Sequence, residues 1–171
     1  MKKISLFICT FSLIFFMIGC SNSSTNSSLS KIDSIDDVTN KTGKLSCTRQ
    51  ADTDSGIIPS FNYYVTYKDD NILELHSIEK VTSDNSDSLD QYEIAYEKIN
   101  NYYDGLEYYD TVVTRNNDTV TRDTVINYEK IDTSKLLAIE GEKDNIIENG
   151  KAKLSLWFEF GKKFGITCTE D

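Results

Sequence analysis

The sequence predicts an α+β domain in which an antiparallel β-sheet carries one long helix and shorter C-terminal helices packed on one face. Two patterns predict this fold. Several segments alternate polar and apolar residues, are rich in β-branched and aromatic side chains, and are separated by short polar turns. Between them lies a stretch whose apolar residues recur every three or four positions, as on one face of a helix. We expect residues 44–171 to form this single domain, because that length is typical of one hydrophobic core.

Three strands are expected in the first half of the domain. Residues 44–50 alternate and open the sheet, and residues 61–68 form the clearest strand. The sequence Asp-Asp-Asn at 69–71 predicts a hairpin turn, which leads into a third strand at residues 72–82. These three strands therefore form the start of an antiparallel sheet.

The long helix is expected at residues 89–104. Ser88, with Gln91 three residues later, predicts a capping box at its start. Gly105 lies where a glycine commonly ends a helix. The stripe that should face the sheet consists of Leu89, Tyr92, Tyr96, Ile99, Tyr103 and Leu106.

Two further strands and a short helix follow. Residues 108–115 and 119–128 alternate and are joined by a polar turn, so they predict a second hairpin. Asp132 is a suitable N-cap for a short helix at residues 133–139.

The segment at residues 153–163 fits both a strand and a helix. Its apolar residues alternate at Leu154, Leu156, Phe158 and Phe160, as in a strand. A helical spacing also fits, and it uses Leu154, Trp157, Phe158, Gly161 and Phe164. We favour a helix that ends at Gly165, followed by an extended piece at residues 166–168.

The first twenty residues have the features of a secretory signal. Lys2 and Lys3 precede an apolar run at residues 4–18, which is shorter than the roughly 20 residues that a transmembrane helix needs. The run ends in Met-Ile-Gly-Cys at residues 17–20, which resembles the lipobox of bacterial lipoproteins, although that motif usually has leucine where Met17 stands. An uncleaved signal anchor with an unmodified Cys20 is the alternative.

The lipobox resemblance implies that residues 1–19 are a lipoprotein signal peptide. Cys20 would then carry a diacylglyceryl thioether and become the new N-terminus, and two acyl chains hold a protein on the membrane stably, whereas one holds it only marginally. Small polar residues dominate 21–30, so we expect residues 20–43 to be a lipidated and flexible Ser- and Asn-rich tether. The expected location is extracytoplasmic, on the cell membrane.

Two of the four cysteines remain for the exported domain, because Cys9 leaves with the signal peptide and Cys20 takes the lipid. An even number of cysteines outside the cytoplasm favours a disulfide, so Cys47 and Cys168 are expected to pair. Cys47 lies in the first expected strand and Cys168 in the last extended piece. Two separately buried thiols are the alternative.

Residues 119–133 carry a resemblance to a known family. The sequence Ile-Asn-Tyr-Glu-Lys-Ile-Asp at 126–132, followed by Lys135, Leu136 and Leu137, resembles the YehR-like family of small bacterial lipoproteins. In that family a lipobox is followed by a hairpin, a Tyr-rich helix, two strands and a short Leu-containing helix. The resemblance implies an envelope lipoprotein of unknown activity, and it supplies no catalytic residues.

Catalytic and metal sites are not indicated by the sequence. His76 is the only histidine, and no nucleophile motif accompanies it, so we expect an ordinary strand histidine and no enzyme. The acidic sequence at residues 52–56 begins like a calcium loop but lacks the closing glutamate, so a solvated turn is expected there. No cofactor and no metal are predicted. A net charge of −10 argues against nucleic acid as a partner.

Tyrosines are the best candidates for a binding surface. Neighbouring residues in a strand point to opposite faces, so one tyrosine of each adjacent pair is expected to be exposed, where it stacks on a sugar or anchors a peptide. The alternative is that the tyrosines build half-buried sheet and helix surfaces. The candidates are Tyr63, Tyr64, Tyr102, Tyr103, Tyr108 and Tyr109. The expected function is a non-catalytic envelope module that binds a peptide, a sugar or a partner protein, and a cell-surface hydrolase is the alternative.

Overall fold

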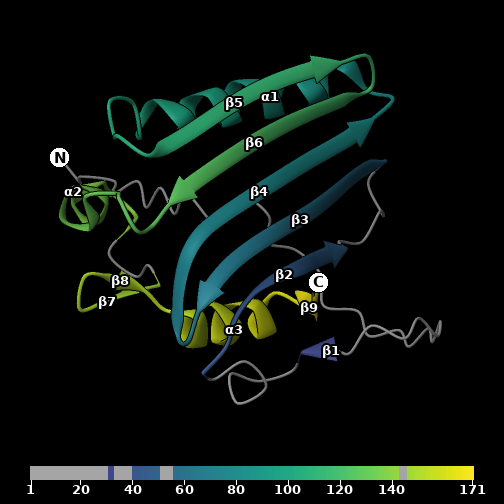
Figure 1. The fold of residues 1–171 in the computed structure, drawn as a ribbon. Coiled ribbons are helices and arrows are strands. Elements are labelled where there is room, and N and C mark those ends of the chain that lie inside the picture. The colour runs from purple at the N-terminus through teal and green to yellow at the C-terminus, as the bar shows by residue number, and fades with distance from the viewer. Residues whose placement is uncertain (1–30, 33–39, 51–55, 143–145) are drawn as a thin grey trace, which may run out of the picture.

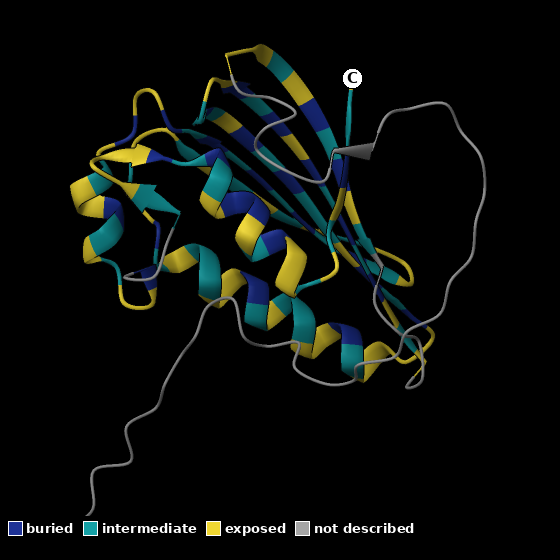
Figure 2. Cartoon of the chain, turned by 90° about the horizontal axis from the view of Figure 1, so that it is seen from below, coloured by how far each residue is buried: buried dark blue, intermediate teal, exposed yellow. Residues whose placement is uncertain are grey.

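The computed structural model describes residues 31–32, 40–50, 56–142 and 146–171, and these residues have the predicted α+β architecture (Figure 1). Within them, seven strands form an antiparallel sheet in the order β1-β9-β2-β3-β4-β6-β5. Helices α1 and α3 both lie on one face of this sheet (Figure 2). The predicted signal peptide and the predicted lipidation site Cys20 lie outside the described residues.

All five predicted sheet strands are present, and the extended piece near the C-terminus is a strand as well. Their bounds are β2 (Thr42–Gln50), β3 (Ile57–Lys68), β4 (Asn71–Ser83), β5 (Tyr109–Asn116), β6 (Thr119–Asn127) and β9 (Thr167–Glu170). β3 begins four residues earlier than predicted and runs through Pro59. A proline is tolerated there because the β2 pairing ends at Ser60, so that among the described residues Pro59 has a strand partner only in β4.

Sheet pairing starts earlier than the predicted domain boundary at residue 44. β1 (Lys31–Ile32) lies within the expected tether and pairs with β9, where Ile32 is opposite Cys168. β2 also begins two residues before the boundary. A second, two-stranded sheet of β7 (Ile147–Glu148) and β8 (Lys151–Ala152) was not predicted, because two-residue strands have no measurable periodicity.

The long helix α1 spans Ser86–Asn101, and its predicted start is wrong by one turn. Asn85, not Ser88, is the N-cap: the Asn85 side-chain oxygen accepts a hydrogen bond from the Ser88 backbone N–H at 3.1 Å. The polar residues before Leu89 form the first turn of the helix. The chain then continues as a turn to Gly105. Its φ of +76° favours glycine, because glycine has no β-carbon to clash in that conformation.

The predicted apolar stripe of α1 does face the sheet. Leu89, Tyr96 and Tyr103 are buried, and Tyr92 and Ile99 are half-buried at the margin of the same surface. The stripe was therefore predicted correctly even though the helix boundaries were not.

Leu89 and Ile94 provide a matched test of this orientation. Leu89 is 1% exposed, whereas Ile94 is 64% exposed on the outer side of the same helix. Leu89→Ala is expected to lower the free energy of unfolding by about 3 kcal/mol, because it empties a packed site. Ile94→Ala is expected to change it by less than about 0.5 kcal/mol. Urea unfolding curves of the two variants check this, and equal losses would mean that α1 is rotated relative to the sheet.

The ambiguous segment is a helix, as favoured. α3 spans Leu154–Lys163 and buries Trp157 and Phe158, whereas Leu156, which a strand would bury, is 39% exposed. Its N-terminus is capped by Asp70 from the β3–β4 turn, which accepts hydrogen bonds from the Ser155 N–H at 2.7 Å and the Ser155 hydroxyl at 3.1 Å. A capping residue 85 positions away leaves no local signal in the sequence, which explains the ambiguity.

The short helix α2 spans Thr133–Ala138 and follows the end of β6, close to the predicted range. Asp132 caps it as predicted, with its side chain accepting hydrogen bonds from the N–H groups of Ser134 and Lys135. Tyr128, Ile131 and Leu136 bring this segment into the main hydrophobic core.

Candidate functional site

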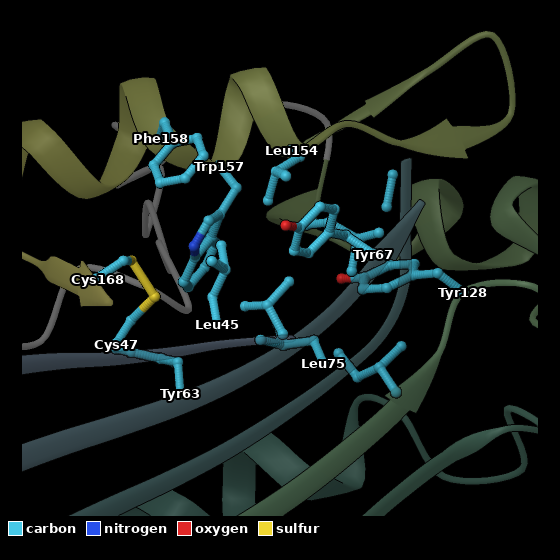
Figure 3. Close-up of a cluster of buried hydrophobic side chains, with 14 of the residues drawn as sticks. Leu45, Cys47, Tyr63, Tyr67, Leu75, Tyr128, Leu154, Trp157, Phe158 and Cys168 are labelled. Atoms are coloured by element: carbon cyan, nitrogen blue, oxygen red, sulfur yellow. A yellow bond between two sulfur atoms is a disulfide. The ribbon is translucent and has the colours of Figure 1, made fainter. Parts of the chain in front are cut away.

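Cys47 and Cys168 form the predicted disulfide. They are directly opposite each other in the antiparallel strands β2 and β9, with their Cα atoms 4.0 Å apart. Figure 3 shows the bond at the edge of the core, beside Trp157 and Phe158 of α3. Both cysteines are almost completely buried. The disulfide therefore joins the first long strand of the domain to the last.

The six candidate tyrosines do not form a single site. Tyr63 is buried and its ring packs edge-on against Trp157, whereas Tyr64, its neighbour in β3, is 45% exposed on the opposite face. The expected alternation is thus confirmed for this pair. Tyr102 is half-buried and Tyr108 is exposed.

The remaining two candidates face the helix side of the sheet. Tyr103 is buried and Tyr109 is half-buried, and their rings are stacked in parallel with centroids 4.1 Å apart. The Tyr103 hydroxyl donates a hydrogen bond to Glu142. These two tyrosines consequently contribute to packing and are not available to a ligand on the surface.

Tyr64 belongs to the face of the sheet that α1 and α3 leave uncovered. Its ring lies beside the imidazole of His76, with ring centroids 5.6 Å apart. The Nε2 atom of His76 is 2.8 Å from Asp123 Oδ1 across the β4–β6 pair. Val112, 53% exposed, lies on the same face opposite Asp123. This open-face patch, defined as Tyr64, His76, Asp123 and Val112, combines an exposed ring with hydrogen-bonding and charged groups.

His76 has beside it a carboxylate that could orient the ring of a catalytic base. Asp123 is hydrogen-bonded to one ring nitrogen, yet the pair lies on a broad sheet face and both side chains are over a third exposed. Within the described part of the chain, the structure places no serine or cysteine in hydrogen-bonding contact with His76. The arrangement is that of a cross-strand hydrogen bond on a solvated sheet.

A second polar group, which sequence reasoning missed, lies between α1 and the sheet. Glu79 in β4 and Arg122 in β6 both point to the helix side, and their closest charged atoms are 3.6 Å apart. Their side chains are only 16% and 9% exposed. Burial raises the pKa of Glu79, and the attraction of Arg122 opposes that rise.

Further polar groups fix the position of Arg122. Its Nε donates to Asn100 of α1 at 2.8 Å, and a terminal nitrogen donates to the Tyr109 hydroxyl at 3.1 Å. Burial raises the pKa of Tyr109 to about 12, against the opposing effect of Arg122, so its hydroxyl stays neutral at physiological pH. We call Glu79, Arg122, Asn100 and Tyr109 the buried polar network. It connects α1 to three strands and thereby fixes where the helix docks.

The alternation in β4 and β6 was a usable signal for this network. In β4, Glu79 points to the same face of the sheet as the buried Leu75, Ser77 and Val81. In β6, Arg122 points to the same face as the buried Val120 and Thr124. A charge at an inward position of each of two neighbouring strands predicts a buried pair.

No helix in the described ranges is both long enough and apolar enough to cross a membrane. No cluster of three or more histidine, cysteine, aspartate or glutamate side chains is placed to hold a metal ion in those ranges. Residues 52–55 of the acidic loop, where a solvated turn is expected, lie outside those ranges.

No family model and no curated protein matches the chain, whereas solved structures do. The chain is similar to the NMR structure of the Escherichia coli YehR protein, with a TM-score of 0.49 and 18% identity over 75% of this chain and 91% of that one. It is also similar to the NMR structure of a protein from Streptococcus pneumoniae TIGR4, with a TM-score of 0.45 and 17% identity over 92% and 100%. These similarities concern the fold.

Proposed function

We propose that the chain is an extracytoplasmic lipoprotein, anchored to the cell membrane through Cys20, whose domain is a non-catalytic binding or interaction module of the cell envelope. The disulfide between Cys47 and Cys168 is the observation that carries the proposal. Structural disulfides persist in oxidising compartments, so this bond supports export of the domain. With these two cysteines paired, Cys20 is the remaining cysteine after the signal segment and is free to take a lipid.

The position of β1 supports attachment close to the membrane. Lys31 is eleven residues after Cys20, so a lipid on Cys20 would lie close to β1 along the chain. The β1–β9 side of the sheet is then the side next to the membrane, and β5 is the strand farthest from it in the sheet order. The open face and the β5 edge would thus be accessible to other envelope molecules.

The open-face patch supports a binding role. Tyr64 keeps 45% of its surface exposed although it is in the middle of a β-strand, and the neighbouring His76 and Asp123 supply donors and acceptors. A tyrosine ring with polar neighbours suits recognition of a peptide or a sugar, because it offers a flat apolar surface and a hydroxyl at low conformational cost.

Fatty-acid labelling tests the anchoring part of this proposal. Cells that express the wild-type chain and are fed an alkyne-bearing palmitate analogue are expected to yield a labelled protein in the membrane fraction. Cys20→Ala is expected to remove the label, because the thiol that accepts the lipid is gone. Cys9→Ala is the matched control and should leave labelling unchanged, since that cysteine lies in the signal peptide. Equal labelling of wild type and Cys20→Ala would refute the anchor.

A cell-surface hydrolase is the second candidate, and the contact between His76 and Asp123 is the observation that favours it. In a hydrolase of this kind His76 would act as the general base and Asp123 would orient its ring. Ester, amide and glycoside substrates can be screened with wild type and His76→Gln. An activity that wild type has and His76→Gln lacks would replace the binding module with an enzyme.

A further inference from the structure

The β5 strand presents an unpaired edge whose free backbone groups can be identified. The Asn127 N–H donates to the Tyr108 carbonyl at 3.0 Å, and in the continuing ladder Asp110, Val112 and Thr114 are opposite Val125, Asp123 and Thr121. Alternate residues of an antiparallel strand direct their N–H and C=O groups to the same neighbour. Residues 108, 110, 112 and 114 therefore bond to β6, and Thr111, Val113 and Arg115 point their backbone groups away from the sheet. Within the described residues no strand pairs with that side of β5.

We propose that the β5 edge binds an extended basic peptide segment of a partner protein, which adds to the sheet as a further antiparallel or parallel strand. The proposal rests on the proposed function, because it names the partner class and the surface of the binding module. In this mode the N–H and C=O groups of Thr111 and Val113 provide the hydrogen bonds, and Val112 provides an exposed apolar neighbour on the open face.

The charge of the β5 edge favours a peptide over a second copy of this chain as the occupant. Two copies joined through their β5 edges would bring the exposed carboxylates of both edges together, among them Asp110 in the strand and Asp118 in the turn after it. Like charges that face each other across paired strands are destabilising, whereas a basic peptide is attracted.

The charge around the edge favours a basic peptide. Exposed carboxylates lie near both ends of β5. Asp104 and Glu107 precede the strand, Asp110 is its second residue, and Asp118 lies in the turn after it. Arg115, the cation of the strand itself, is already paired with Asp90 and Glu93 of α1. The net charge of the chain is −10, so a cationic partner is attracted to this edge and an anionic one is repelled.

A synthetic peptide tests the proposal directly. The probe is a fluorescent, acetylated hexapeptide of alternating lysine and valine, titrated at low salt into the purified full chain, whether or not that chain carries a lipid. Saturable binding is expected, together with slower hydrogen exchange at the Thr111 and Val113 amides and weaker binding as salt is added. The same peptide with an N-methyl group on every residue is expected not to bind, because it has no N–H group left on either edge to donate to a strand.

Substitutions at one residue locate the site. Val113→Pro removes an outward N–H while it leaves the bonds between β5 and β6 in place, so it is expected to abolish peptide binding. Val113→Ala keeps that N–H and is the matched control, which should bind. The N-methylated peptide decides the question on the wild-type protein if Val113→Pro does not fold.

Three results would overturn the inference. The first is equal binding of the N-methylated peptide or equal binding by Val113→Pro, which would place the site elsewhere. The second is a lack of peptide binding by wild type at low salt. The third is a concentration-dependent dimer that Val113→Pro dissolves, which would make a second copy the occupant. None of these depends on lipid labelling at Cys20, so a failure of this inference is distinguishable from a failure of the proposed anchor.

Discussion

Loss of the disulfide is expected to destabilise the domain more than any other single change considered. Cys47 and Cys168 are 121 residues apart in sequence, so their bond removes a large amount of entropy from the unfolded chain. For a loop of that length the chain-entropy model gives about 4–5 kcal/mol. Cys47→Ala is therefore expected to lower the free energy of unfolding by about that amount, as measured by guanidinium denaturation followed through Trp157 fluorescence.

Matched variants separate the bond from the packing of its sulfurs. Cys168→Ala and the double variant Cys47→Ala/Cys168→Ala should lose about as much as Cys47→Ala, because each removes the same bond. Reduction of the wild type should have a similar effect without any change of side-chain volume. A loss below about 1 kcal/mol in the reduced wild type would mean that the cross-link contributes little and that the core alone holds β9 in the sheet.

Loss of Arg122 is expected to have an effect of similar size. Arg122→Met leaves the carboxylate of Glu79 between α1 and the sheet without its cation, and breaking a buried ion pair on one side typically costs about 3–5 kcal/mol. The loss should shrink as the pH falls, because burial raises the pKa of Glu79 and its protonated form needs no cation. Urea unfolding at several pH values measures both effects.

The double variant Glu79→Leu/Arg122→Met is the control for this prediction. It removes both charges, so it is expected to be more stable than Arg122→Met alone although it has one more substitution. If the double variant were as unstable as the single one, the cost would come from the lost contacts of Arg122 with Asn100 and Tyr109. The ion pair with Glu79 would then be a minor part of the buried polar network.

Most of the fold could be predicted because its main elements have strong local patterns. The strands at residues 61–68 and 119–128 alternate cleanly, and the apolar stripe of α1 has unbroken helical spacing. The start of α1 was predicted wrongly and the α3 segment was ambiguous, because single capping residues, one of them distant in sequence, decide where these helices begin. Ser88 looked like a cap, but Asn85 takes that role one turn earlier, and Asp70 caps α3 from another element.

The candidate sites divide in the same way. The partners Cys47 and Cys168 followed from counting cysteines, and the burial of Tyr63 beside the exposed Tyr64 followed from strand alternation. The buried polar network was missed because Glu79 and Arg122 are 43 residues apart in sequence. They are brought together only by the pairing of β4 with β6. The unpaired backbone groups of β5 could not be predicted for the same reason, since the strand order decides which strand lies at the edge of the sheet.

The intact mass of the protein extracted from membranes is the most direct test of the central claim, that this is an exported lipoprotein with a disulfide-bonded domain. We predict one species that lacks residues 1–19, carries the added mass of a diacylglyceryl group on Cys20, and gains two hydrogens when Cys47 and Cys168 are reduced. A species that retains residues 1–19 without added lipid, or one whose mass does not change on reduction, would contradict it.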